Sequence, residues 1–131
     1  MPEWSVNMLK ICYIGNYEII QFRDYGQVFF INYSELDQSN VFDTLQQSDL
    51  LLLEISENCI DKIIRWIFNL HCKMNIPILA ILDNCNNRDK LKLDKIGVMD
   101  YIDKDFEIDK IELKIENMIR LISWQKKNKM V

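Results

Sequence analysis

The chain has 131 residues, with 16 basic and 20 acidic side chains and a formal net charge of -4 at pH 7. This length fits one domain that buries roughly two-thirds of the surface its unfolded chain exposes. The acidic balance lacks the electrostatic footprint of a nucleic-acid binder, so we expect no direct nucleic-acid binding by this domain. No stretch of about eighteen apolar residues and no signal-peptide pattern occurs, which predicts no membrane segment and a cytoplasmic protein.

The cysteines and the single histidine do not suggest a metal site. Cys12, Cys59, Cys72 and Cys85 are scattered without the CxxC spacing of a zinc site or redox pair. We expect them to be reduced thiols, mostly acting as small core residues. His71 precedes Cys72 near a predicted helix end, and this pair supplies too few ligands for zinc. We therefore expect a helix-end histidine, with no metal and no other cofactor.

The first part of the chain predicts two strands with a short helix between them. Residues 9–14 form a strand that stops at the turn-forming pair Gly15 and Asn16. Residues 17–25 place apolar side chains at helical spacing before a glycine suited to a helix end. The β-branched and aromatic content of residues 27–32 predicts the second strand.

The middle of the chain holds its most apolar strand. Val41, Phe42 and Leu45 fit one face of a small helix. In residues 48–56, four consecutive leucines stand between polar residues, which indicates a strand buried on both faces, since a half-exposed strand would alternate. The leucines end at Glu54. Ligands of open α/β sheets bind at the carboxyl ends of the strands, so Glu54 is a candidate site residue.

A helix, a strand and a second helix follow. Residues 59–73 carry apolar side chains at helical spacing, and residues 76–82 form another buried apolar run. Residues 86–96 read as a charged helix that ends at Gly97. We expect this helix to show three apolar residues to the core: Leu91, Leu93 and Ile96.

The last part of the chain adds one strand and one helix. Residues 98–102 form a short strand, and residues 107–123 form an amphipathic helix. We expect residues 1–124 to be the domain and residues 125–131 to be a basic tail or the start of a linker. Strand and helix thus alternate along the chain, which specifies an α/β fold: a doubly wound, five-stranded parallel sheet of (βα)5 type with right-handed crossovers.

Two segments resemble the receiver domain of bacterial two-component response regulators. Residues 48–54, Ser-Asp-Leu-Leu-Leu-Leu-Glu, look like the segment that ends in the phosphoacceptor aspartate. Residues 97–106, Gly-Val-Met-Asp-Tyr-Ile-Asp-Lys-Asp-Phe, are similar to the family's Gly-Ala-Asp-Asp-Tyr-Leu-x-Lys-Pro-Phe. The resemblance covers residues 9–123 and implies a flavodoxin-like strand order 2-1-3-4-5. It also implies that Lys104 is the family's lysine and Tyr101 its switch aromatic residue.

Other positions depart from the family's pattern. Gly15 and Asn16 stand where an acidic pair binds Mg²⁺, an ion that needs carboxylate oxygens. Glu54 replaces the phosphoacceptor aspartate, and its extra methylene spoils the alignment for in-line phosphoryl transfer. Leu82 has no hydroxyl where the family has a switch threonine or serine, and Asp105 replaces the proline after the lysine.

These departures predict an atypical receiver that is not an enzyme and works without phosphorylation. One hypothesis is that Glu54 pairs with Lys104 across the strand ends and stands in for the phosphoryl group. The alternative is a partly exposed ion pair worth under ~1 kcal/mol that fixes no conformation. The remaining residues of the predicted pocket are Gly15, Asn16, Leu82 and Asp83.

A mixed-charge surface is the second candidate site. Receivers commonly dimerise through the face made by their fourth helix, fifth strand and fifth helix, and we expect a homodimer through the matching face here. The alternative is that these charges are merely solvated. The candidate interface residues are Lys92, Lys95, Asp100, Asp103, Lys110, Leu113 and Lys114.

Three functions stay open at this point. The favoured one is a regulatory module that acts by protein contacts, either as an adaptor or ahead of a DNA-binding effector domain beyond residue 131 in a transcription regulator. The second is a working phosphoacceptor that uses Glu54 or Asp83 with a rearranged metal site. The third is a flavodoxin-like small-molecule binder, against which stands the lack of a glycine-rich phosphate loop.

Overall fold

The computed structural model describes residues 9–15, 27–105 and 108–129. Its five-stranded sheet is parallel and has the order β2-β1-β3-β4-β5, which confirms the predicted fold class and strand order. The strands are β1 (Lys10–Ile14), β2 (Gln27–Ile31), β3 (Leu50–Ser56), β4 (Ile78–Asp83) and β5 (Asp100–Asp103). The helix predicted over residues 17–25 and the site residue Asn16 lie outside the described residues.

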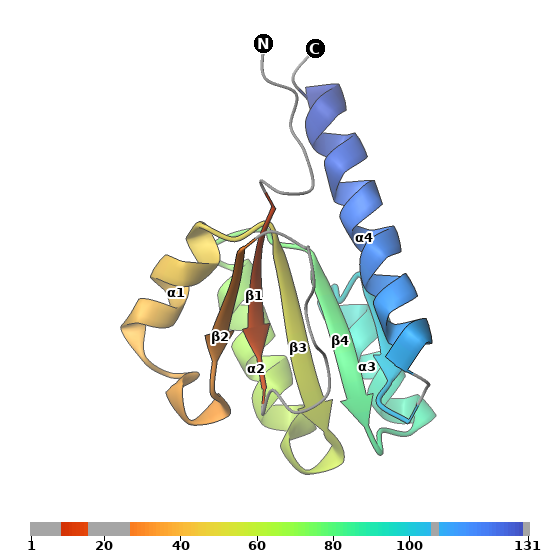
Figure 1. The fold of residues 1–131 in the computed structure, drawn as a ribbon. Coiled ribbons are helices and arrows are strands. Elements are labelled where there is room, and N and C mark those ends of the chain that lie inside the picture. Colours follow the sequence, from red (N-terminus) through yellow and green to blue (C-terminus); the bar gives the residue numbers. More distant parts are fainter. Residues whose placement is uncertain (1–8, 16–26, 106–107, 130–131) are drawn as a thin grey trace.

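Helices cover both faces of the sheet (Figure 1). The helices are α1 (Ser39–Gln46), α2 (Ile60–His71), α3 (Asn87–Ile96) and α4 (Ile108–Lys129), with short 3-10 turns η2 (Tyr33–Glu35) and η3 (Glu57–Cys59). On one face, α1, α2 and α3 pack against alternate strand residues such as Leu51, Leu53 and Ala80. On the other face, α4 packs against the intervening residues, such as Leu50, Leu52 and Leu79. Among the described residues, no helix is long and apolar enough to cross a membrane.

The central strand β3 is buried on both faces, as its leucine run predicts. Its four leucines have no exposed surface, and they belong alternately to the two core clusters. A parallel strand flanked by two others and covered by helices has no solvated face, so polar residues are excluded until the strand ends. The first polar residue of β3 is Glu54, at the carboxyl end of the sheet.

Local capping signals explain the bounds of α3. The Asn86 side chain accepts a hydrogen bond from the Asp89 backbone N–H, and the Asp89 carboxylate accepts one from the Asn86 N–H, which forms a capping box. The helix ends at Gly97, whose φ of 94° lies in the left-handed region that favours glycine. Leu91 was expected in the core, but 60% of it is exposed. It lies two residues before the buried Leu93, which places it on the opposite side of the helix.

The last helix is longer than expected. The sequence predicted a helix over residues 107–123, whereas α4 runs from Ile108 to Lys129 and includes most of the expected tail. Residues 124–129 contain no glycine or proline, and lysine and glutamine are good helix formers, so the helix continues past Ser123. Figure 1 shows that the final turns of α4 extend past the amino ends of the strands.

The environments of the cysteines and of His71 agree with roles in packing and at a helix end. The four cysteines are free thiols, and Cys12 is fully buried, which raises its pKa to about 12. His71 ends α2 as predicted, with Nδ1 3.2 Å from the carbonyl oxygen of Ile96. This contact joins the ends of α2 and α3 far from the carboxyl edge of the sheet, where Glu54 lies.

Candidate strand-end site

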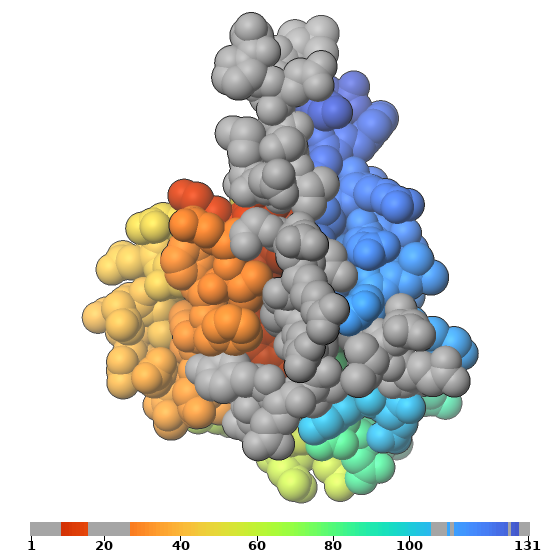
Figure 2. Space-filling view, in the orientation of Figure 1, coloured from red at the N-terminus to blue at the C-terminus, as the bar shows by residue number. Residues whose placement is uncertain are grey.

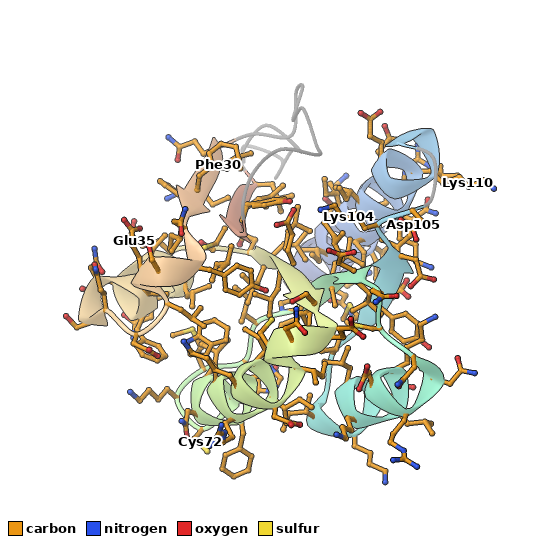
Figure 3. All side chains as sticks on the ribbon, turned by 90° about the horizontal axis from the view of Figure 1, so that it is seen from below. Phe30, Glu35, Cys72, Lys104, Asp105 and Lys110 are labelled. Atoms are coloured by element: carbon orange, nitrogen blue, oxygen red, sulfur yellow. The ribbon has the colours of Figure 1, made fainter. Side chains whose placement is uncertain are left out.

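A cleft of about 440 Å³ lies at the carboxyl ends of β3 and β4. It therefore occupies the position at which ligands of open α/β sheets bind. Three of the predicted residues line it: Glu54, Asp83 and Lys104. The other lining residues are Tyr33, Ser34, Ile55, Ser56, Cys59, Lys62, Ile63 and Ile81. Figure 3 views the molecule from this end, with Lys104 between the strands and the start of α4.

Glu54 is the buried charge of the cleft, since only 8% of it is exposed. Its carboxylate oxygen Oε1 accepts a short hydrogen bond from the phenol of Tyr13 on β1. Because side chains alternate along a strand, Glu54 projects to the same face as Leu52, and the register pairs Leu52 with Tyr13. The neighbouring strand thus supplies the donor that a buried carboxylate needs.

Tyr13 is held in the neutral form by this environment. Burial is the largest cause that raises the pKa of its phenol, and the hydrogen bond and charge of Glu54 raise it further. Tyr33, which lines the cleft, also has a raised pKa, mainly because it is buried. Neither tyrosine was singled out from the sequence. A tyrosine within an otherwise apolar buried strand was the available signal, because its hydroxyl requires a partner.

The absence of a side chain at Gly15 provides the space that the Glu54 side chain occupies. Ile14 pairs with Leu53 in the β1–β3 register, so Gly15 comes level with Glu54 at the strand ends. A Cβ atom built on Gly15 would lie 2.6 Å from Cδ and 2.7 Å from Cγ of Glu54. The longer glutamate side chain therefore reaches over the end of β1 and fills the space beside the glycine.

Lys104 does not form the hypothesised ion pair with Glu54. Its backbone N–H donates to the carbonyl of Leu82 over 2.7 Å, which continues the β4–β5 ladder beyond β5, and its exposed side chain lines the cleft. The ion pairs between described residues do not include Lys104. Glu54 reaches toward β1 and Tyr13, and Lys104 lies at the end of β5, on the other side of β4.

The other predicted pocket residues are divided between the cleft and the core. Asp83 is exposed and is the last residue of β4. Leu82 points to the opposite face and belongs to the core cluster under α1, α2 and α3. Among the residues the structure describes, no three or more His, Cys, Asp or Glu side chains come together in a group that could hold a metal ion.

The predicted interface residues lie on α3, β5 and α4, and several form ion pairs within the chain. Lys114 pairs with Asp100 over 3.2 Å, and Lys90 pairs with Asp103 over 3.3 Å. Tyr101 is half-buried beneath the Lys90 ammonium group, which lies 5.8 Å from its ring centroid. The remaining members are exposed: Lys92, which pairs with Asp61 on α2, Lys95, Lys110 and Leu113. Figure 3 shows Lys110 projecting away from the sheet.

Comparison with known proteins identifies the fold. No family model and no curated protein matches the chain. A CheY-like protein, TadZ of Pseudomonas aeruginosa, has a similar structure, with a TM-score of 0.66 and 13% identity over 87% of this chain and 98% of that chain. A putative pilus assembly-related protein of Burkholderia pseudomallei gives 0.60 and 13%, over 89% of this chain and 93% of that chain.

A larger protein contains a similar unit. NtrX of Brucella abortus, solved in complex with ADP, matches with a TM-score of 0.67 and 15% identity over 92% of this chain. The chain spans 28% of the length of NtrX. Together these likenesses show that the chain has the fold of CheY-like receiver domains.

Proposed function

We propose that this protein is a cytoplasmic, receiver-like regulatory module that acts through protein–protein contacts and does not depend on phosphorylation. The proposal rests on the hydrogen bond that the Tyr13 phenol donates to Glu54, whose side chain fills the space beside Gly15. In this arrangement the strand-end carboxylate already has a hydrogen-bond donor from its own chain.

The geometry of the strand end is unfavourable for phosphoryl transfer. That reaction requires positioning of the attacking oxygen in line with the leaving group, together with a metal ion that neutralises the developing charge. Glu54 is turned toward β1 and is largely buried, and Gly15 contributes no carboxylate to a metal site. Both requirements are therefore weakened by the same pair of residues.

The Glu54 side chain instead occupies the strand end where the family carries its phosphoacceptor. Burying a carboxylate is costly unless it is hydrogen-bonded, and the Tyr13 phenol offsets part of this cost. Because the phenol remains protonated up to high pH, it serves as a permanent donor at neutral pH. A permanent side chain in place of a transient phosphoryl group would keep the domain in one signalling conformation.

The surface through which the module acts is the face of α3, β5 and α4, which we propose as the contact of a homodimer. The Lys90–Asp103 pair joins α3 to β5, and the Lys114–Asp100 pair joins α4 to β5. These internal pairs link charged side chains of the three elements across one continuous face. Their side chains are 22–40% exposed, so each pair adds only modestly to stability.

The test compares the wild-type protein with a variant that restores the family's acidic residues: Gly15→Asp, Asn16→Asp and Glu54→Asp combined. Both proteins are treated with acetyl phosphate and Mg²⁺ and examined by intact mass. Beryllofluoride with Mg²⁺ is then titrated while amide chemical shifts are recorded. We expect neither an acyl phosphate nor a shift in the wild-type protein, and a response in the restored variant.

A phosphorylated wild-type protein would contradict the proposal and support the phosphoacceptor alternative. Glu54→Gln and Asp83→Asn would then show which carboxylate carries the phosphoryl group. If neither protein responds, the restored variant must first be shown to bind Mg²⁺ before the wild-type result counts.

A further inference from the structure

Helices α2 and α3 lie side by side on the face of the sheet opposite α4. The Asp61 carboxylate of α2 lies 3.4 Å from the Lys92 ammonium group of α3. At the end of α2, His71 Nδ1 lies 3.2 Å from the carbonyl oxygen of Ile96. Figure 3 shows the two helices next to each other, with side chains that project away from the sheet, and in Figure 2 both are largely hidden because the view is from the opposite face. The two contacts define which side of each helix faces the other.

The side of α2 that continues from Asp61 is exposed. Arg65 and Phe68 follow Asp61 by four and seven residues, so the three side chains lie along one side of the helix. All three are exposed. Lys62 faces another way, because its ammonium group lies 3.8 Å from the carboxylate of Asp37, between η2 and α1. The side chains of α2 thus divide between a side toward α3 and a side toward α1.

The matching side of α3 is basic. Arg88 lies four residues before Lys92 and Lys95 lies three residues after it, so all three share one side of the helix. Leu91 borders this side, and all four residues are exposed. Lys90 faces away from α2, because it pairs with β5. We call the combined surface the α2–α3 face, and its residues are Asp61, Arg65, Phe68, Arg88, Leu91, Lys92 and Lys95.

The α2–α3 face has an excess of positive charge in an acidic protein. It holds four basic residues and one acidic residue, and that acidic residue is already paired with Lys92. Arg65, Arg88 and Lys95 form no ion pair with any described residue. Together, α2 and α3 contain six basic and three acidic residues, a net charge of +3 within the total of -4, so the rest of the chain carries -7.

Two large apolar side chains are exposed among these basic residues. Phe68 is 58% exposed and Leu91 is 60% exposed. A single exposed leucine is common on protein surfaces. Here an aromatic and an aliphatic side chain project from two neighbouring helices, with unpaired basic groups on the same sides of those helices. The face therefore combines apolar contact area with positive charge, which is the pattern of a surface for a partner that is both apolar and acidic.

We propose that the α2–α3 face binds an acidic amphipathic helix of a different protein. The apolar side of that helix packs on Phe68 and Leu91. Carboxylates at its edges pair with Arg65, Arg88 and Lys95, and an arginine fork matches the two oxygens of a carboxylate. The partner is helical because α2 and α3 use their own backbone groups internally. An extended segment would find no backbone partners on this face, whereas a helix satisfies its own.

The charge of the remaining chain argues against other occupants. Nucleic acid and an anionic membrane are extended polyanions, and the net charge of -7 outside α2 and α3 would be repelled by them. A short acidic helix meets mainly the basic face itself, because charges further away than about 8–10 Å are screened. A two-fold contact with a second copy would place the basic face against itself, which like charges oppose.

The test uses a synthetic peptide of about 18 residues, or about five helical turns, with leucines on one side and glutamates flanking them. A side-chain lactam keeps the peptide helical, and its binding to the full chain is followed by fluorescence anisotropy. The test variants are Arg65→Glu and Leu91→Ser. We expect at least about tenfold weaker binding by each of them than by the wild-type protein.

Two controls match these variants. Lys62→Glu makes the same change of charge on the other side of α2, and Leu121→Ser removes an apolar side chain of α4 that is 42% exposed. We expect both to bind the acidic peptide like the wild-type protein. Amide chemical shifts recorded during the titration should change along α2 and α3.

The sharper measurement exchanges the charges on both partners. A double variant, Arg65→Glu with Arg88→Glu, is titrated with the acidic peptide and with a version that has lysines in place of the glutamates. We expect the wild-type protein to prefer the acidic peptide and the double variant to prefer the basic one. Lys62→Glu with Lys73→Glu has the same total charge, with both changes on the side of α2 toward α1, and should keep the preference for the acidic peptide.

Other outcomes overturn the inference. They are a wild-type protein that does not bind the acidic peptide, controls that lose binding like the test variants, or shift changes confined to other elements. Tighter binding of single-stranded DNA or of vesicles containing phosphatidylserine than of the peptide would also overturn it. Circular dichroism checks that each variant is folded, which we expect because the substituted side chains are exposed.

The inference rests on the proposed protein-contact function, and the two have separate readouts. If the peptide does not bind and the wild-type chain still resists phosphorylation, the phosphorylation-independent function stands and only the α2–α3 face is refuted. A phosphorylated wild-type chain refutes that function, and the peptide titrations still decide the role of this face.

Discussion

Gly15→Ala is expected to destabilise the protein by displacing Glu54. A Cβ at residue 15 would lie 2.6 Å from Cδ of Glu54, well inside the optimal carbon–carbon separation of about 3.5–4.0 Å. Gly97 is the glycine with positive φ among the described residues, so the effect at Gly15 is steric and does not come from its backbone conformation. Either β1 shifts, or the glutamate leaves its buried position.

The cost follows from what the displaced carboxylate loses. A hydrogen bond to a charged group is worth about 1.5–3 kcal/mol, and Glu54 gives up the bond from Tyr13. Replacing glycine by alanine returns about 0.4–1 kcal/mol, because the unfolded chain has less freedom. We expect a net loss of about 1–2 kcal/mol in the wild-type protein. In a Glu54→Ala background the overlap is absent, so the same change should be neutral or slightly stabilising.

Urea unfolding is measured for the wild-type protein, Gly15→Ala, Glu54→Ala and the double variant. These four free energies of unfolding give the coupling free energy between residues 15 and 54. Tyr13→Phe provides a second background, in which Glu54 has no phenol to lose and Gly15→Ala should cost less than in the wild-type protein. A coupling below about 0.5 kcal/mol, the usual limit of additivity, would refute the account of Glu54 as a side chain held in place by Tyr13 and Gly15.

Two further predictions concern titration and thiol chemistry. Burial raises the pKa values of Tyr13 and Tyr33, so above about pH 10 the unfolded chain loses phenolic protons that the folded protein keeps. Their contribution to stability is fully present below that pH and is lost above it; urea unfolding should show this fall, and Tyr13→Phe should reduce it. Cys72 is exposed and should react with Ellman's reagent in the folded protein, whereas Cys12, buried and with a pKa raised to about 12, should react only after unfolding. Equal rates for the two thiols would contradict the packing around Cys12.

The fold could be predicted from the sequence because its signals are local. The leucine run of β3 identified a strand with no solvated face, and the alternation of strands and helices specified a parallel sheet. Gly97 marked the end of α3 in the same way. Each of these signals depends on residues close together in the chain, so no knowledge of distant contacts was needed.

The bonding at the strand ends was decided by the tertiary structure. The sequence indicated that Glu54 and Lys104 reach the same edge of the sheet, and both line one cleft. Which partner Glu54 takes depends on the register of β1 and β3, which places Tyr13 on its face and Gly15 beside it. That register joins residues about forty positions apart, and strand pairing at such a distance leaves no trace in the local pattern.

The outer side of α4 shows the same division. Helical spacing identified Ile115, Met118, Ile119 and Ile122 as the core side, and all four are buried. Composition could not show that Trp124 would be exposed. Its exposure depends on how much of α4 lies over the sheet, and the final turns of the helix extend past the amino ends of the strands (Figure 1). The sequence determined which residues could form a core, and the packing of α4 on the sheet decided which apolar residues remained outside it.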